Sequence, residues 1–173
     1  MKRSVPLFVM AVMLATPLAA GAQTAAPDCA SVTAPALPQA WSAFAAPEAL
    51  TAAAKAADQP EIQLGHAYGL TLTPAAQTEY SVAPKMITPG TFGGLVMLTV
   101  DKAGVYSVAI SGKVWVDVIR DGQAMKSVSH QDGEPCAAIH KTVNFQLDPG
   151  HYTLQLSNAP SKDATVEVLS PNS

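Results

Sequence analysis

The chain is poor in charge, aromatic side chains and cysteine, and each shortage narrows what the protein can be. Charged residues make up 13% and aromatic residues 6% of its 173 residues, and the formal net charge is −3. The few lysines and arginines are scattered, so the sequence has no basic stripe of the kind that binds nucleic acid or anionic lipid. It also lacks a G-x-S-x-G nucleophile elbow and a glycine-rich phosphate-binding loop, which argues against the hydrolase and nucleotide-binding classes that carry them.

Long apolar runs are absent after the first twenty residues. Lys2 and Arg3 precede an apolar run over residues 5–20 that ends in small residues at Ala22. This is the pattern of a secretory signal peptide, residues 1–22, and it makes Gln23 the first residue of the exported chain. A retained anchor is the alternative. Removing Lys2 and Arg3 lowers the net charge by two, to −5, and we expect a periplasmic or secreted location with no membrane span in the mature chain.

The two cysteines are Cys29 and Cys136. In an exported chain an even pair most often forms a disulfide, so we expect Cys29 to be bonded to Cys136. Two free thiols, or a thiol that ligates a metal, are the competing interpretations.

The composition changes along the chain. Residues 23–40 are rich in Ala, Pro, Thr and Ser and are interpreted as a linker. Pro47, Glu48 and the alanines that follow predict one short helix over residues 47–57. Residues 41–173 are expected to form a single domain.

From residue 61 onward the apolar residues recur with a period of two. The pattern predicts strands at 61–72, with a break at Gly65 or Gly69, and at 94–100, 105–110, 113–119, 124–129, 139–147, 151–156 and 164–169. Tyr80 and Val82 could add a short strand. Short strands separated by turn residues at this spacing are typical of an all-β, antiparallel β-sandwich, jelly-roll-like, with the short helix leading into it.

Two connections predict a register. Asp121-Gly122 suits a type I′ hairpin, which pairs Arg120 with Gln123 and sets Asp117 opposite Lys126. The segment 148–150 suggests a second hairpin, with Leu147 paired to Tyr152.

The segments that begin at Gly104 and Gly150 share the pattern G-x-Y-x-φ-x-φ-S, where φ is an aliphatic residue. Both strands are therefore expected to bury their tyrosine and aliphatic residues in a common core.

Two resemblances follow from these strands. Residues 147–156, Leu-Asp-Pro-Gly-His-Tyr-Thr-Leu-Gln-Leu, resemble a strand of bacterial pre-peptidase C-terminal domains and related jelly-roll accessory modules, which are exported β-sandwiches that bind or accompany rather than catalyse. Residues 113–118 together with 136–145 resemble a group of short exported proteobacterial proteins of unknown role, some of which carry the label homogentisate 1,2-dioxygenase. The first resemblance implies a non-catalytic accessory module, and that label implies an oxygenase.

The segment 130–140 is the densest cluster of metal-ligating residue types. It contains His130, Glu134 and His140, and two histidines with one carboxylate are what a non-haem iron site needs. His140 begins a strand whose polar face includes Thr142 and Asn144, however, so the alternative is a polar loop anchored at Cys136.

Trp115 lies on the face of its predicted strand opposite the valines. An outward tryptophan beside Asp117 and Lys126 can form a stacking surface for a ligand. The alternative, which we favour from the sequence, is that the N-terminal helix with Trp41 and Phe44 covers it.

These observations favour a non-catalytic exported binding or accessory module with an unknown protein or small-molecule ligand and no cofactor. A small iron-dependent oxygenase using His130, Glu134 and His140 and a structural or assembly partner of an envelope protein are the alternatives.

Overall fold

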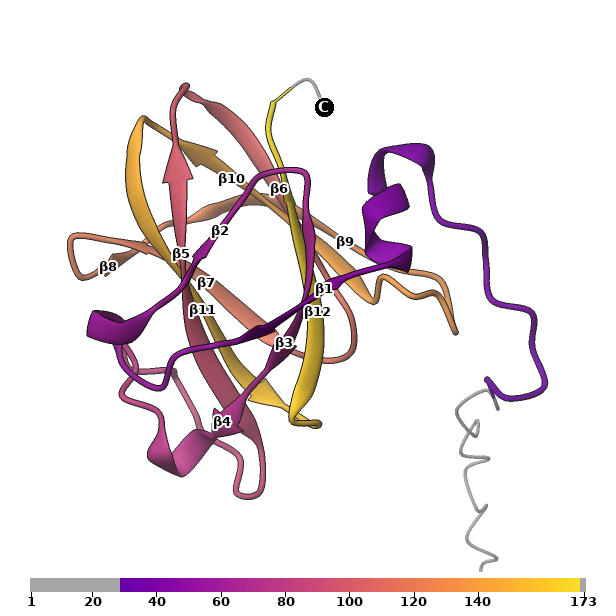
Figure 1. The fold of residues 1–173 in the computed structure, drawn as a ribbon, viewed down its shortest axis with the longest axis horizontal. Coiled ribbons are helices and arrows are strands. Elements are labelled where there is room, and N and C mark those ends of the chain that lie inside the picture. The colour runs from indigo at the N-terminus through magenta and orange to yellow at the C-terminus, as the bar shows by residue number, and fades with distance from the viewer. Residues whose placement is uncertain (1–28, 172–173) are drawn as a thin grey trace, which may run out of the picture.

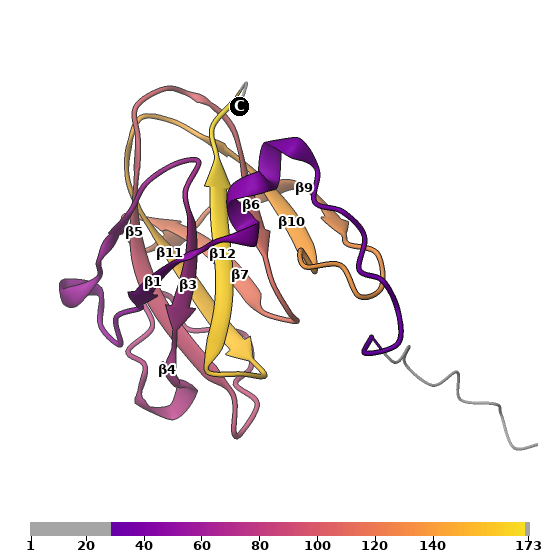
Figure 2. The same cartoon turned by 45° about the vertical axis from the view of Figure 1, so that its right-hand side comes forward.

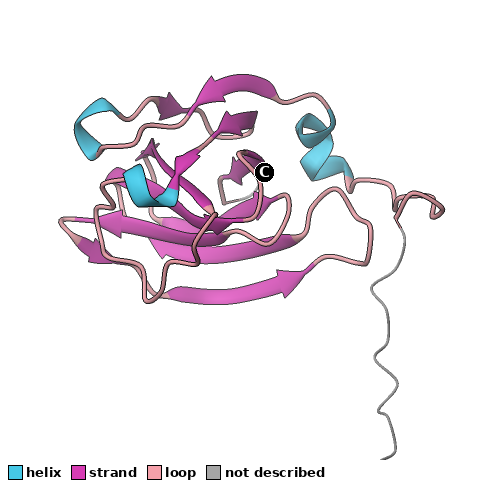
Figure 3. Cartoon of the chain, turned by 90° about the horizontal axis from the view of Figure 1, so that it is seen from below, coloured by secondary structure: helices cyan, strands magenta, loops and turns pink. Residues whose placement is uncertain are grey.

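The computed structural model describes residues 29–171, and the expected signal peptide lies outside them. The described chain is an all-β sandwich of two sheets, as predicted, and three short 3-10 segments lie at its periphery (Figures 1 and 3). Most neighbouring strands are antiparallel. The two parallel pairs, β1 with β3 and β2 with β5, bring the first part of the chain onto both sheets.

We call the two layers sheet A and sheet B. Sheet A has the strand order β1 (Glu48–Thr51), β3 (Ala67–Thr71), β12 (Asp163–Leu169), β6 (Gly104–Ile110), β10 (Lys141–Leu147) and β9 (Ser127–Asp132). Sheet B has the order β2 (Glu61–Ile62), β5 (Phe92–Val100), β11 (Gly150–Ala159), β7 (Trp115–Arg120) and β8 (Gln123–Ala124), and β4 (Thr73–Pro74) also pairs with β5.

The core lies between the sheets and is built from alternate residues of each strand. Leu98, Val108, Val118, Leu154 and Val166 are fully buried there. Alternation in the sequence therefore identified the inward face correctly on these strands.

Tyr106 and Tyr152 occupy matching positions in β6 and β11. Each is 2% exposed, and each hydroxyl donates to the carbonyl four residues earlier, Tyr106 to Lys102 at 2.8 Å and Tyr152 to Asp148 at 2.7 Å. The G-x-Y pattern thus places a tyrosine with an apolar ring in the core and a satisfied hydroxyl at the strand entrance. This confirms that both strands bury their tyrosines in one core.

The first predicted hairpin is confirmed. Asp121 and Gly122 have φ of 52° and 72°, as a type I′ turn requires, and Arg120 pairs with Gln123. β8 ends at Ala124, and the chain then crosses to sheet A, where β9 begins at Ser127. The expected strand 124–129 is therefore two short strands in different sheets.

The second predicted hairpin is wrong. β10 pairs with β6 and β9 in sheet A, whereas β11 pairs with β5 and β7 in sheet B, so Leu147 and Tyr152 are not paired. The residues between them carry the chain across the core. Alternation showed which side chains face inward, but it cannot distinguish a strand beside β10 from one on the opposite sheet.

The predicted helix over residues 47–57 is also wrong. The segment forms β1, parallel to β3, followed by the 3-10 segment η2 (Ala56–Asp58). Ala53 exchanges two backbone hydrogen bonds of 2.9 Å with Leu95, and a Cβ on Gly94 would lie 2.6 Å from that of Ala52. The small alanines thus permit close approach to β5, a tertiary contact that overrides their helix propensity.

The expected strand at 61–72 breaks at Gly65, whose φ of 76° bends the chain from sheet B to sheet A. The Tyr80 and Val82 region is a loop, with no strand assigned between η3 (Ala75–Gln77) and β5 in the described chain.

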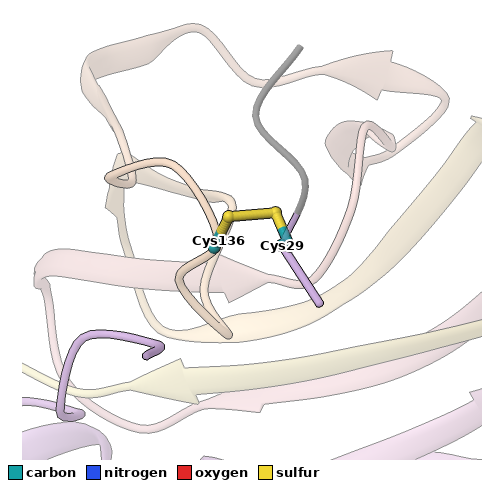
Figure 4. The surroundings of a disulfide bond; sticks show 2 residues. All are labelled: Cys29 and Cys136. Carbon is teal, nitrogen blue, oxygen red and sulfur yellow. A yellow bond between two sulfur atoms is a disulfide. The ribbon is translucent and has the colours of Figure 1, made fainter. Parts of the chain in front are cut away.

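We call residues 29–45 the N-terminal segment. It lies across the outer face of sheet A (Figure 2). Its 3-10 segment η1 (Gln39–Ala45) begins in the last two residues of the expected linker, 23–40, and Phe44 is buried against Ala109 and Ile139. Farther toward the N-terminus, Cys29 is bonded to Cys136 with a Cα–Cα distance of 5.3 Å, which confirms the predicted disulfide (Figure 4).

Candidate functional site

The main recess of interest arises because the two sheets have unequal edges. Beyond Ala124 sheet B has no strand beside β7, whereas sheet A continues through β10 to β9. The six residues of β9 are all exposed. We call the resulting recess, which has a volume of about 550 Å³, the edge groove.

Strands from both sheets, the β8–β9 connection and one distant loop line the edge groove. Its lining residues are Lys85, Trp115, Val116, Asp117, Met125, Lys126, Ser127, His130, Asp132, Lys141, Val143 and Phe145. His130 is paired with Val143 and Asp132 with Lys141. Because directly paired residues share a face, His130 and Asp132 face the inner side of sheet A, where sheet B does not cover them.

Trp115 stands at the wall of the groove and is 53% exposed. Its indole Nε1 donates to Asp117 Oδ1 at 3.1 Å, and the Lys141 Nζ lies 5.7 Å from the ring centroid. The expectation that the N-terminal segment covers Trp115 is therefore wrong. Trp41 and Phe44 pack instead on the outer face of sheet A, on Ala109 and Ile139.

Lys141 crosses the groove from sheet A to sheet B. Its ammonium donates to the carbonyl of Val114 at 3.1 Å, and burial lowers its pKa, partly opposed by the charge of Asp132. Neither Lys141 nor Lys85 was identified from the sequence. For Lys141 a signal existed, because it is the one charged residue in the otherwise apolar inward series of β10.

Asp117 and Lys126, predicted as a cross-strand ion pair, both line the groove but form no ion pair in the described structure. The hairpin ladder stops at Ala124 because the chain turns toward sheet A. Asp117 accepts from the indole of Trp115 instead. The three residues proposed as a ligand surface, Trp115, Asp117 and Lys126, are thus brought together, although not in the expected register.

The three candidate iron ligands are not brought together. His130 lies in the edge groove, while Glu134 lines a separate pocket of about 280 Å³ beneath the N-terminal segment. The described residues contain no group of three or more His, Cys, Asp or Glu side chains able to share a metal ion. The backbone of His140 is bonded to Ile110 and Gly133, which fixes it at the start of β10. The geometry gives no support to an iron site at His130, Glu134 and His140.

A second place where chemistry could be sought is the contact of Thr99 with His151. The Thr99 hydroxyl lies 3.1 Å from His151 Nδ1 and donates its proton to Glu61. Since that proton is already directed at a carboxylate, the histidine can only donate to the hydroxyl and cannot act as its base. The group is a surface polar network between β2, β5 and β11.

Neither family models nor curated protein sequences give a match to the chain. Within residues 29–171, no helix has both the length and the apolar character needed to cross a bilayer.

Proposed function

We propose that the protein is an exported, non-catalytic binding module that holds its ligand in the edge groove. The observation that carries this proposal is Trp115, a large aromatic residue that is 53% exposed at the wall of a recess of about 550 Å³. Aromatic platforms flanked by a few polar groups are common in ligand sites, because the ring supplies contact area and the polar groups supply orientation.

The mixture of charges in the groove supports binding over catalysis. Two of its charged groups are already hydrogen-bonded, Asp117 to the indole of Trp115 and Lys141 to a backbone carbonyl. A catalytic site needs a nucleophile, its base and an orienting group within reach of one another. The groove residues offer ammonium groups and an aromatic face, which suit recognition.

An exported location, in the periplasm or outside the cell, is part of this proposal. The signal-peptide pattern of residues 1–22 and the Cys29–Cys136 disulfide both support it, since structural disulfides persist in oxidising compartments.

The test is a binding screen of the wild type and Trp115→Ala against immobilised short peptides and soluble polysaccharides. We expect at least one probe to bind the wild type and to be lost with Trp115→Ala. Val105→Ala is the matched control, because Val105 is also an exposed apolar residue and lies on β6 outside the groove. Equal binding by the Trp115 variant, or no binding by the wild type, would contradict the proposal. So would stoichiometric iron in the purified protein that is lost with His140→Ala.

A further inference from the structure

The edge groove lies where one more strand of sheet B would lie. Adjacent strands in a sheet lie about 4.8 Å apart and packed sheets about 10 Å apart, so a strand added beside β7 would lie over β9 and β10. That is the region where sheet A continues and sheet B does not. The inward side chains of His130 and Asp132 are exposed because that strand is absent.

The backbone of β7 has free hydrogen-bonding groups at this edge. In an antiparallel sheet the N–H and C=O of alternate residues point to opposite neighbours. The backbone N–H and C=O of Val118 point to this edge, because the Val118 carbonyl accepts a hydrogen bond from Met125 N at 2.7 Å. The carbonyl of Val114 points the same way and accepts from Lys141 Nζ at 3.1 Å. Val116 lies between these two capped positions, and no hydrogen bond joins its backbone to an open-side partner in the described chain.

The charge around this edge is positive although the protein is acidic. Lys85, Lys126 and Lys141 come from three separate segments and outnumber the two carboxylates of the groove, Asp117 and Asp132. The mature chain carries a net charge near −5. A ligand with negative charge therefore matches this site better than the rest of the surface.

We propose that the occupant of the edge groove is an extended, acidic peptide segment of another protein, which adds to sheet B as a strand beside β7. This inference rests on the proposed function and names its ligand class. The backbone of Val116 would bond to the segment, and its carboxylates would meet the three lysines. Alternate side chains of the segment would point toward Val143 and Phe145 on sheet A, which is the recognition mode of strand addition.

A saccharide is the competing ligand, because sugar rings stack on an exposed tryptophan. A sugar would use Trp115 and the lysines, but it would leave the edge of β7 unpaired. The free N–H and C=O of Val116 and the overhang of β9 are features that a peptide uses and a sugar does not, so the observations favour the peptide.

The experiment measures amide hydrogen exchange by NMR on the full mature protein. The probe is a capped eight-residue peptide of alternating valine and glutamate, and the matched control peptide has lysine in place of glutamate. We expect the glutamate peptide to slow exchange at the Val116 amide at least about tenfold, since an exposed edge amide becomes hydrogen-bonded. The lysine peptide should leave it unchanged.

Charge reversal tests the role of the lysines. Lys126→Glu should weaken binding of the glutamate peptide several-fold, whereas Lys102→Glu, which changes a lysine outside the groove, should not. Equal weakening by both variants would show a general charge effect and overturn the assignment of this groove.

The saccharide arm uses polygalacturonate on the same labelled protein. If it shifts the Trp115 indole signal without slowing the Val116 amide, and the peptide does not bind, the strand-addition proposal is wrong and the binding-module proposal stands. If neither probe perturbs Trp115 or Val116, both proposals are contradicted.

Discussion

Trp115 and Phe44 are large aromatic residues in opposite surroundings, and truncation should affect them differently. Phe44 is 5% exposed and packs on Ala109 and Ile139, whereas Trp115 is 53% exposed. Phe44→Ala should lower the free energy of unfolding by about 3 kcal/mol, the low end for a buried aromatic because its cluster is peripheral. Trp115→Ala should change it by no more than about 0.5 kcal/mol. Urea denaturation midpoints measure both, and equal losses would contradict the placement of Trp115 at the surface.

Glu167 is a carboxylate held away from water. It is 1% exposed on the outer face of sheet A and is paired in the ladders with Ala67 and Ala109. It accepts a hydrogen bond from the backbone of Phe44, and its Oε2 has no partner in the described structure. Burial raises its pKa, while the nearby His66 and the bond from Phe44 act in the opposite direction.

Replacing this carboxylate should make stability less dependent on pH. Above the raised pKa, burial of the charge destabilises the folded wild type, so Glu167→Gln should be the more stable protein at about pH 8. As the pH falls through the pKa of Glu167 in the folded protein, the folded wild type binds a proton. The unfolded chain does not yet bind it, because the pKa of this carboxyl is near 4.5 there. The difference in the free energy of unfolding between Glu167→Gln and the wild type should then narrow. It should disappear once the pH is below the pKa of the unfolded chain. Urea midpoints of both proteins across this range test it, and a constant gap would contradict it.

At the scale of elements, the segment between η3 and β5 is held by two side-chain amides of β11. The side-chain amide of Gln155 accepts a hydrogen bond from Val82 N at 3.2 Å and donates one to Val82 O at 2.8 Å. It thus makes the two bonds to Val82 that the backbone of a neighbouring strand would otherwise make. Asn158 accepts from Thr88 N and donates to Met86 O, each at 2.8 Å. The segment therefore stays on the outer face of sheet B, where it carries Lys85 to the edge groove.

Gln155→Ala should release this segment. Losing both bonds leaves the N–H and C=O of the half-buried Val82 without these partners, at a cost of about 2 kcal/mol, which favours local opening roughly thirtyfold. Trypsin cleavage after Lys85 measures the opening. Asn144→Ala is the matched control, because Asn144 bonds to Ser107 and Ser129 on sheet A and does not reach this segment. Equal cleavage rates in the two variants would count against the role of Gln155.

The elements that could be predicted from the sequence are those fixed by local signals. The turn at Asp121-Gly122 demands positive φ, and the inward series of β7 and β10 follow from alternation, so both were identified. The pairing of β10 with β6 and the strand at Glu48–Thr51 depend on contacts between segments that are separated along the chain, which alternation and helix propensity do not encode.

The candidate site was predicted in part for the same reason. Trp115, Asp117 and Lys126 stood out because they lie on or near one strongly patterned strand. Lys85 and Lys141 reach the groove from a loop and from the opposite sheet, and the exposure of Trp115 depends on where η1 docks. Where these side chains lie depends on how the whole chain folds. The local pattern of β10 marks Lys141 as an unusual inward charge, but it does not place that charge in the groove.

At the scale of the whole molecule, the disulfide joins the N-terminal segment to the loop between β9 and β10. Cys29 and Cys136 are 107 residues apart, and cross-linking a loop of that length removes up to about 4–5 kcal/mol of unfolded-state entropy in the chain model. Residues 29–36 are mostly exposed, so this part of the chain buries little surface against the sandwich. The sandwich between β1 and β12 has its own continuous core.

Cys29→Ser combined with Cys136→Ser should therefore loosen the N-terminal segment while the sandwich persists. We expect an unchanged β-type circular dichroism spectrum and a free energy of unfolding lower by about 2–4 kcal/mol, less than the full entropic value because part of the closed loop lies outside the core. In a Trp115→Phe background Trp41 becomes the one tryptophan, and its fluorescence should shift to the red as it leaves the cluster with Phe44 and Ile139. The oxidised Trp115→Phe protein is the control. Identical denaturation midpoints and identical Trp41 emission in the two proteins would show that the bond does not hold the segment in place.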